Sequence, residues 1–542
     1  MLLKSAYIAC AIVSAFALES AAQSKTGGSR PGIDVLHYDF QLQVPLFYRA
    51  IEGEATIKFR RTARVDTLVL DLVGMKADQI RVNGIAAQSV QTDSTLRLTL
   101  PAGSGDTLTV SLRFSGEPKD GLIFSTDTTG RFQAFGDNFP NRGRFWLPTV
   151  DHPADKATVN WTVIAPSDRR VIANGALIEE RPLLGMPART MTRYETSRPI
   201  ATYLMVIGVA PFATVDLGES ACGLAEKSSC VRQSVWASPE VRDYLPGPFA
   251  KAGAIVDYFS KLVGPFPYEK LAHVQSATRY GGMENASAIF YADNLFKRRT
   301  LTEGLIAHET AHQWFGDAVT ESEWPHVWLS EGFATYFSAL WTEHAYGDSA
   351  FRADLTRMRS GAIGNTIAVE KAVVDTTLSD VSKVLNSNVY PKAGFTLHML
   401  RREIGDSAFF RGIRAYYAKY RHKNALTQDL MHEFESASGQ SLGWFFGQWF
   451  WRAGFAELTI GWRYDSAKQR VILDVEQGAR FAPYRVRMAV DIVDSAGDVR
   501  RASVTIPAEP HSVVEVPLSA PAAPSRIVLD ADVGVLGTIT RK

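Results

Sequence analysis

The chain has 542 residues, which exceeds one typical hydrophobic core and predicts two to four domains. Its hydrophobic share of 46% and charged share of 21% are ordinary for a globular protein. The formal net charge of +1 gives no electrostatic reason to expect nucleic acid or an anionic membrane as a partner, and no basic patch with interleaved aromatics is visible.

The first residues have the layout of a secretory signal peptide. Lys4 precedes an apolar run over residues 6–18, and residues 20–22 are small. This run is shorter than the roughly 20 residues that a membrane-spanning helix needs. We therefore predict a signal peptide over residues 1–23 and a secreted or periplasmic protein without stable membrane insertion after cleavage. A retained membrane anchor is the alternative.

Residues from about Ile33 to Val215 alternate between apolar and polar, with turn residues in between. The alternation predicts half-buried strands in HYDFQLQVP, TLRLTLP, TLTVSLRFSG and TVNWTVIAP. The segment ATYLMVIGVAPF predicts a last buried strand. We expect an all-β domain over residues 24–215.

Helical periodicity dominates from about Ser234 to Gly454. It predicts helices in EVRDYLPGPFAKAGAIVDYFSKLVG, LTEGLIAHETAHQWFG, SEGFATYFSALWTEHAYG and AGFTLHMLRREIG, and LAHVQSA is strand-like. Strand alternation returns after about Glu457, from ELTIGWRY to RIVLDAD, with the spacing of a small sandwich. We expect a largely helical domain with a few strands over residues 216–455 and a β-sandwich over residues 456–542.

Two of the three cysteines lie outside the predicted signal peptide. Cys222 and Cys230 are eight residues apart in a polar segment. In an oxidising compartment this spacing predicts a disulfide that closes a short loop, and two unpaired thiols are the alternative. No CxxC pair exists, so we do not expect a thiolate zinc site.

The segment LIAHETAHQWFGD, residues 305–317, contains the pattern HETAH. On a helix, His308 and His312 share one face and can present ring nitrogens to one metal ion. Glu309 lies roughly 100° round the helix, within reach of a water beside the metal. This is the HExxH arrangement of zinc peptidases. A helix with two structural histidines is the alternative.

A catalytic zinc site needs a third protein ligand and one open position. Glu331 follows His312 by nineteen residues, in VWLSEGFATYF, which also has helical periodicity. A helix–turn–helix would bring its carboxylate to the two imidazoles. We expect one Zn²⁺ per chain, held by His308, His312 and Glu331.

Two further segments, RYGGMENAS and NVYPKAGFTLHML, complete an ordered set of motifs. GGMEN, HETAH, WLSEGFA and YPKAG resemble the fingerprints of the gluzincin aminopeptidases, the aminopeptidase N and leukotriene hydrolase family. Three positions depart from the usual pattern: Ser330, Ala393 and Ala456. The resemblance covers most of the chain after the predicted signal peptide. It implies a multidomain α+β fold with a saddle-like all-β N-terminal domain, a thermolysin-like catalytic domain and a C-terminal β-sandwich.

The same resemblance implies a zinc-dependent aminopeptidase that acts on peptides with a free N-terminus. Glu309 would be the general base, and Tyr390 would stabilise the oxyanion. Glu284 would bind the substrate's α-ammonium group. The rest of the motif would line the substrate site: Gly281, Gly282, Met283 and Asn285. Alone, Tyr390 could be a core aromatic and Glu284 a surface carboxylate.

Other family features map less directly onto this chain. Asp137 or Asn138 could supply a second amine anchor. Asp317 could hydrogen-bond a ligand histidine, or it could be a plain acid at the end of the helix. His326 and His344 are interpreted as structural or surface residues. We expect a short form without the large C-terminal helical domain of many relatives. The rival functions are a zinc endopeptidase on the same catalytic fold and a non-catalytic peptide-binding relative.

Overall fold

The computed structural model describes residues 29–103, 105–184, 188–224, 230–518 and 523–542. The predicted signal peptide lies outside the described residues. The chain divides into two compact units. The first unit extends to Trp324 and also includes Thr377–Val384 and Tyr420–Ala425, and the second contains the remaining residues from Pro325 onward.

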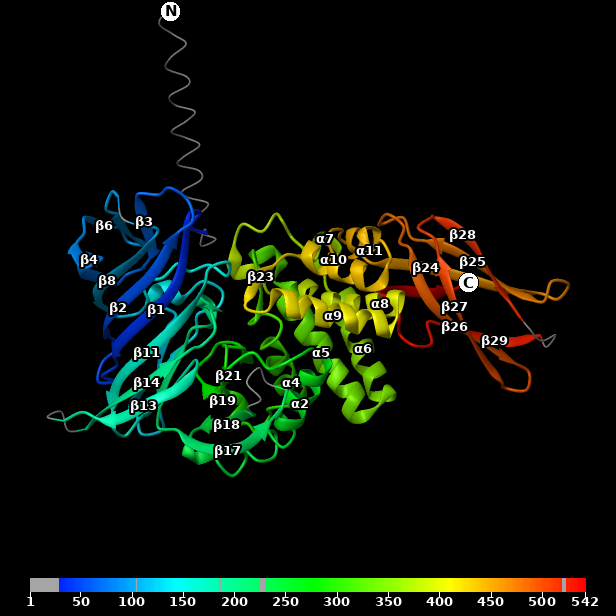
Figure 1. Ribbon diagram of the computed structural model, residues 1–542. Coiled ribbons are helices and arrows are strands. Elements are labelled where there is room, and N and C mark those ends of the chain that lie inside the picture. Colours follow the sequence, from blue (N-terminus) through cyan, green and yellow to red (C-terminus); the bar gives the residue numbers. More distant parts are fainter. Residues whose placement is uncertain (1–28, 104, 185–187, 225–229, 519–522) are drawn as a thin grey trace, which may run out of the picture. The chain divides into compact units, whose positions relative to one another are not determined.

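A nine-stranded sheet dominates the N-terminal part of the first unit (Figure 1). In sheet order its strands are β13 (Ala176–Pro182), β14 (Arg189–Glu195), β11 (Lys156–Pro166), β1 (Ile33–Gln43), β2 (Ile51–Arg61), β8 (Thr107–Gly116), β4 (Lys76–Val82) and β5 (Ile85–Ala86), with β15 (Ile200–Ala201) paired to β11. Strand β1 is parallel to β11 and antiparallel to β2. Alternate residues of β8 are buried, as the alternating sequence TLTVSLRFSG predicts.

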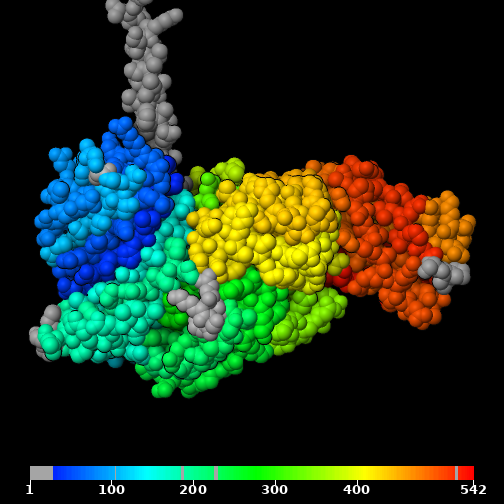
Figure 2. Space-filling model, in the orientation of Figure 1, coloured from blue at the N-terminus to red at the C-terminus, as the bar shows by residue number. Residues whose placement is uncertain are grey.

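Two smaller sheets accompany this large one, and the surface of the N-terminal strands is blue to cyan in Figure 2. One sheet contains β12 (Arg170–Ala173), β16 (Ile207–Ala210), β10 (Phe132–Gly136) and β9 (Leu122–Thr126). The other contains β3 (Thr67–Asp71), β7 (Thr95–Thr99) and β6 (Ser89–Gln91). The predicted β-rich N-terminal architecture is confirmed.

The segment ATYLMVIGVAPF is not the single strand that its sequence predicts. A 3-10 turn, Thr202–Leu204, separates β15 from β16. The Thr202 hydroxyl donates to the carbonyl oxygen of Val150 at 2.9 Å, and the Asn138 amide donates to that of Met205 at 2.6 Å. Side chains therefore satisfy backbone groups that a continuous ladder would otherwise pair.

A mixed five-stranded sheet follows within the first unit, and Figure 1 shows its strands in green. Its order is β17 (Ala213–Ser220), β18 (Val231–Ala237), β19 (Leu271–Ser276), β21 (Ala288–Ala292) and β20 (Gly282–Met283). Its helices are α2 (Ala252–Leu262), α3 (Asp293–Lys297) and α4 (Glu303–His312), and β22 (Val319–Glu321) pairs with β23 (Lys423–Ala425). Strands β18, β19 and β21 are parallel, and β20 is an antiparallel edge strand.

Helix α2 is shorter than its sequence pattern predicts. After a 3-10 turn at Pro239–Val241, the chain forms turns until α2 begins at Ala252. Pro246 and Pro248 explain the delay, because proline lacks a backbone donor and disfavours helical geometry in the residue before it. The predicted disulfide between Cys222 and Cys230 is present. No helix among the described residues is long and apolar enough to span a membrane.

The second unit begins with helices and ends with two small sheets, drawn in orange and red in Figure 1. The helices are α5 (Trp328–Tyr346), α6 (Asp348–Ile363), α7 (Ile367–Glu370), α8 (Ala393–Ile404), α9 (Asp406–Tyr420), α10 (Thr427–Ser438) and α11 (Gly443–Trp449), with a π-helical turn at Asn388–Lys392. One sheet is β28 (His511–Pro517), β25 (Arg470–Gln477), β24 (Ala456–Asp465) and β30 (Gly537–Arg541). The other is β27 (Val499–Ile506), β26 (Val486–Asp494) and β29 (Pro524–Leu529). The two sheets agree with the predicted C-terminal β architecture.

Candidate metal and peptide site

Helix α4 presents the two histidines of HETAH on one face. The Thr302 hydroxyl caps the helix by accepting from the backbone N–H of Leu305 at 3.2 Å. The Nε2 atoms of His308 and His312 lie 3.2 Å apart. The Nδ1 atom of His312 lies 3.2 Å from the carbonyl oxygen of Phe315, which can only accept, so Nδ1 carries the proton. The Nε2 lone pair of His312 is therefore available to a metal ion.

Two carboxylates lie beside His312. One side-chain ligand atom from each of Glu284, Glu309 and His312 falls within 4.8 Å of the other two. All three side chains are buried. Helix α4 and the GGMEN segment therefore place an acid from each motif next to the same imidazole.

The other members of the GGMEN segment lie along and beyond edge strand β20. Met283 is buried and pairs with Phe290 of β21. The carbonyl oxygen of Gly281 accepts from the backbone of Ala292 at 3.1 Å. Asn285 is fully buried. The motif is therefore an ordered extension of the sheet.

Glu331 and Tyr390 meet within the second unit. The phenol of Tyr390 donates to Oε1 of Glu331 at 2.8 Å. Glu331 lies in the first turn of α5, and Tyr390 lies in the π-helical turn before α8. A β-carbon on Gly332 would lie 2.7 Å from that of Ala393, so α5 and α8 approach closely beside this pair.

The π-helical turn is held by buried polar side chains. The Asn388 amide donates to the carbonyl oxygens of Lys371 at 2.9 Å and of Ile367 at 3.2 Å. Lys392 is almost fully buried, and burial lowers the pKa of its amine to about 7. Such turns often mark functional sites, and this one fixes the backbone that bears Tyr390.

Asp137 and Asn138, the two candidates for a second amine anchor, both already have hydrogen-bond or ion-pair partners within the protein. Asn138 donates to main-chain carbonyl oxygens, and its own oxygen accepts from the indole of Trp146 at 2.8 Å. Asp137 lies 3.0 Å from the guanidinium of Arg142 and 3.5 Å from that of Arg279, and it is fully buried. A substrate amine at Asp137 would therefore compete with two guanidinium groups.

Asp317 does not hydrogen-bond a ligand histidine, so only the alternative of an acid at the end of the helix remains. Its carboxylate accepts from the side-chain amide of Gln313 at 2.8 Å, whereas the Nδ1 atom of His312 faces Phe315. Burial raises the pKa of Asp317 well above its ordinary value, and the nearby Glu284 raises it further. Gln313 is a site residue that the sequence did not predict, because its only signal is its place directly after HETAH. His326 is structural as predicted, with Nδ1 2.8 Å from the Thr427 hydroxyl.

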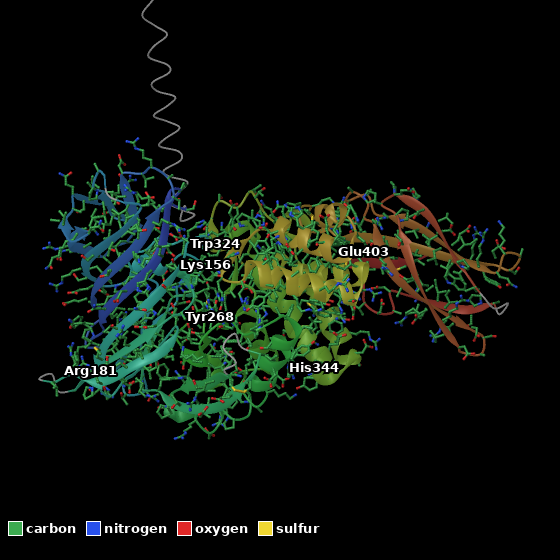
Figure 3. The ribbon with its side chains drawn as sticks, in the orientation of Figure 1. Lys156, Arg181, Tyr268, Trp324, His344 and Glu403 are labelled. Carbon is green, nitrogen blue, oxygen red and sulfur yellow. A yellow bond between two sulfur atoms is a disulfide. The ribbon has the colours of Figure 1, made fainter. Side chains whose placement is uncertain are left out.

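The large β-sheet also contacts the loop after α4. Lys156 of β11, labelled in Figure 3, donates to the carbonyl oxygens of Asp317 and Ala318 at 2.9 Å each. Lys156 is half-buried, and desolvation lowers the pKa of its amine to about 7. The N-terminal sheet thus fixes the chain just beyond α4, the helix that bears His308 and His312.

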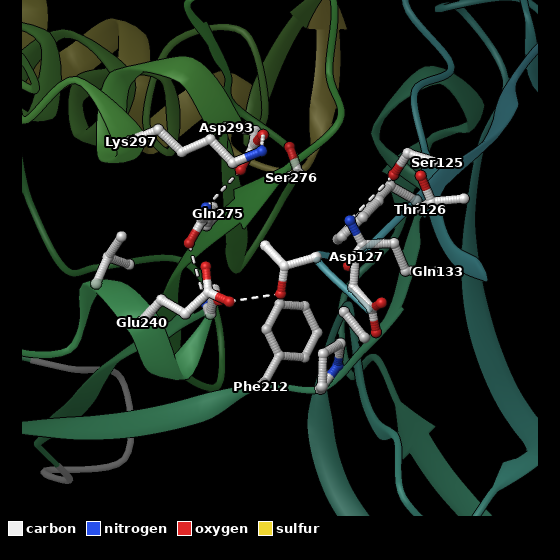
Figure 4. A pocket seen from close by; sticks show the side chains of 16 residues that line it. Ser125, Thr126, Asp127, Gln133, Phe212, Glu240, Gln275, Ser276, Asp293 and Lys297 are labelled. Atoms are coloured by element: carbon white, nitrogen blue, oxygen red, sulfur yellow. Dashed lines mark hydrogen bonds and ion pairs between the residues drawn. The ribbon is translucent and has the colours of Figure 1, made fainter. Parts of the chain in front are cut away.

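A separate cavity of about 90 Å³ lies in the first unit, lined in part by Phe135 and Phe212 (Figure 4). Across it, the Thr128 hydroxyl donates to Glu240 at 2.5 Å. Asp293 accepts from Gln275 and pairs with Lys297. None of the predicted site residues lines this cavity.

An HExxH helix beside a mixed sheet is typical of metallopeptidases, and comparison with known proteins agrees with that class. The Peptidase M1 N-terminal domain family matches residues 35–204, and the Peptidase family M1 domain matches residues 250–449. The chain belongs to peptidase family M1.

This chain spans about half the length of the curated aminopeptidases that it matches. Aminopeptidase M1-D of Oryza sativa subsp. japonica is 25% identical over 453 residues, covering 78% of this chain and 50% of the relative. Leucyl aminopeptidase of Saccharolobus solfataricus is 25% identical over 426 residues, covering 73% and 51%. The M1 zinc metallopeptidase of Deinococcus radiodurans shares the fold, with a TM-score of 0.69, 23% identity and coverage of 79% of this chain and 95% of that one.

Proposed function

We propose that this protein is a zinc-dependent aminopeptidase that removes the N-terminal residue from peptides. One observation carries the proposal: the carboxylates of Glu284 and Glu309 lie within 4.8 Å of a ring nitrogen of His312. An amine-binding acid and a base beside a metal-type histidine are the parts that such a reaction needs. The names of the similar proteins, several of which are aminopeptidases, agree with it.

The proposed zinc ligands are His308, His312 and Glu331. The fixed tautomer of His312 and the facing Nε2 atoms suit a divalent ion with nitrogen ligands. Glu331 supplies the carboxylate at the expected spacing, oriented by Tyr390. When bound, zinc would supply Lewis-acid polarisation of the substrate carbonyl and activation of water.

Proton transfer falls to Glu309. Its carboxylate would take a proton from the attacking water and pass it to the leaving amine. Tyr390 would donate a hydrogen bond to the oxyanion as it forms. Glu309 is 4% exposed, so little bulk water competes for its hydrogen bonds.

Glu284 would bind the α-ammonium group and so set the position of cleavage. Because its carboxylate lies close to that of Glu309, only the first peptide bond fits between the amine site and the base. The same segment would line the site for the first residue through Gly281, Gly282, Met283 and Asn285.

We further propose that the protein acts outside the cytoplasm. The sequence pattern of residues 1–23 and the disulfide between Cys222 and Cys230 both favour a secreted or periplasmic location. Its partners would then be extracytoplasmic peptides with a free N-terminus.

Matched peptides with free and acetylated N-termini test this function. We expect cleavage of the free peptides only, because acetylation removes the charge that Glu284 binds. The control is Glu309→Gln, which should retain zinc and lose turnover. Internal cleavage of acetylated peptides would instead identify an endopeptidase. Binding of free-amine peptides without any turnover would identify a non-catalytic relative.

A further inference from the structure

Gln313 joins the end of α4 to the segment that bears Glu284. Its amide nitrogen donates to the carbonyl oxygen of Glu284 at 2.8 Å and to the carboxylate of Asp317 at 2.8 Å. Its amide oxygen accepts from the backbone of Ser287 at 2.8 Å. The side chain is fully buried. One amide thus bonds both ends of the segment 284–287.

Two residues between β12 and β13 also hydrogen-bond this segment. The Asn174 amide donates to the carbonyl oxygen of Ala286 at 2.8 Å, and its oxygen accepts from Val206 at 2.7 Å. The backbone of Gly175 donates to the hydroxyl of Ser287 at 2.8 Å. The buried side-chain amides of Gln313 and Asn174 therefore both hydrogen-bond segment 284–287.

The conformation of this segment depends on those contacts. Ser287 has a φ of +63°, in the left-handed region that a serine seldom adopts. Such a conformation persists only when its surroundings determine it. Gln313 follows His312 directly in the chain, so any shift of the segment relative to His312 must stretch a hydrogen bond of Gln313.

We propose that Gln313 is a positioning residue that sets where the Glu284 carboxylate stands relative to the metal site, and hence how tightly the protein binds the α-ammonium group of a peptide. The proposal rests on the proposed function. Gln313 acts on the substrate only through Glu284, because its three hydrogen bonds all end on the protein.

Two ligands of similar shape, one with an amine and one without, distinguish a positioning role of Gln313 from a general loss of structure at the site. Leucine hydroxamate carries a metal-chelating group and an amine, and 4-methylpentanohydroxamate carries the same groups without the amine. Binding of each to the zinc-loaded protein is measured by calorimetry. We expect Gln313→Met to lower the affinity for leucine hydroxamate about tenfold, which is the effect of misplacing one charged hydrogen bond. The affinity for the amine-free compound should change by less than about twofold.

The matched control is Gln233→Met. Gln233 is equally buried and lies in the same unit, but its side chain contacts Ser220, Ala252 and His273 instead of the segment 284–287. We expect this variant to lose stability and to leave the difference between the two ligands unchanged. In a Glu284→Gln background, Gln313→Met should cause no further loss for leucine hydroxamate.

Three results would overturn the proposal. Gln313→Met could lower the affinity for both ligands equally, or lower neither affinity. It could also lower the affinity for leucine hydroxamate further in the Glu284→Gln background. Failure of the proposed function has a different signature. In that case the wild-type protein would show no preference for the amine-bearing ligand or no turnover of free-amine peptides.

Discussion

A β-carbon on Gly282 would lie 2.1 Å from Oε1 of Glu309 and 2.3 Å from its Cδ. The backbone of β20 therefore passes directly against the proposed general base. Nothing lies within 4 Å of the equivalent position on Gly281. These two adjacent glycines thus form a natural pair of test and control.

We predict that Gly282→Ala lowers kcat by about a hundredfold while the protein remains folded. The added methyl group must displace the Glu309 carboxylate, whose side chain is flexible enough to move, and a displaced base transfers protons poorly. The measurement is steady-state turnover of an aminoacyl anilide, with thermal unfolding as the check on folding. Because Gly281 is proposed to line the substrate site, Gly281→Ala should change KM at most and keep kcat near the wild-type value. Equal losses of kcat in the two variants would contradict the prediction.

Tyr390→Phe should lower kcat by about 10² to 10³ and leave KM nearly unchanged. The reason is that an oxyanion donor stabilises the transition state more than the bound substrate. Zinc content is measured in parallel, because the same phenol donates to Glu331.

Tyr484→Phe is the matched control for that substitution. It also removes one phenol hydrogen bond in the second unit, from Tyr484 to the carbonyl oxygen of Ala453. Tyr390 would be a core aromatic if Tyr390→Phe raised KM alone, or if it lowered kcat no more than Tyr484→Phe does.

Lys270 predicts a pH dependence of stability. Burial lowers the pKa of its amine from 10.5 to about 7, while Glu269 acts in the opposite direction. At pH values between about 7 and 10.5, the Lys270 amine binds more protons in the unfolded chain than in the folded one. The contribution of Lys270 to the free energy of unfolding should therefore rise with pH, by up to about 1.4 kcal/mol per unit.

Urea unfolding of the wild type and Lys270→Met from pH 6.5 to 10 measures this contribution as a difference. The wild type should gain stability relative to the variant as pH rises through this range. Lys423→Met, at an exposed lysine, should run parallel to the wild type. A pH-independent difference between the wild type and Lys270→Met would contradict the assigned pKa.

The metal-type helix could be predicted because its signal is local. His308 and His312 are one helical turn apart, and this spacing alone places both rings on one face of α4. Gln313 could not be predicted in the same way. Two of its three partners, Ser287 and Glu284, lie 26 and 29 residues earlier in the chain, and no periodicity encodes a hydrogen bond between elements that meet only in the fold.

The same distinction applies to the fold. Alternation predicted the long strands, such as β8, because one buried face imposes it. The break between β15 and β16 depends on the distant Asn138, whose amide takes the carbonyl oxygen of Met205. The late start of α2 could have been predicted from Pro246 and Pro248, whose effect outweighed the helical pattern around them.

Stoichiometric reloading of the metal-free protein tests the central claim most directly. After chelation, zinc is added in small steps while turnover of a free-amine aminoacyl anilide is recorded. We predict that turnover is absent at the start, rises linearly and stops rising at about one zinc per chain. The His312→Ala variant should show no such rise. Full turnover in the chelated protein, or no turnover at any zinc concentration, would contradict a zinc-dependent aminopeptidase.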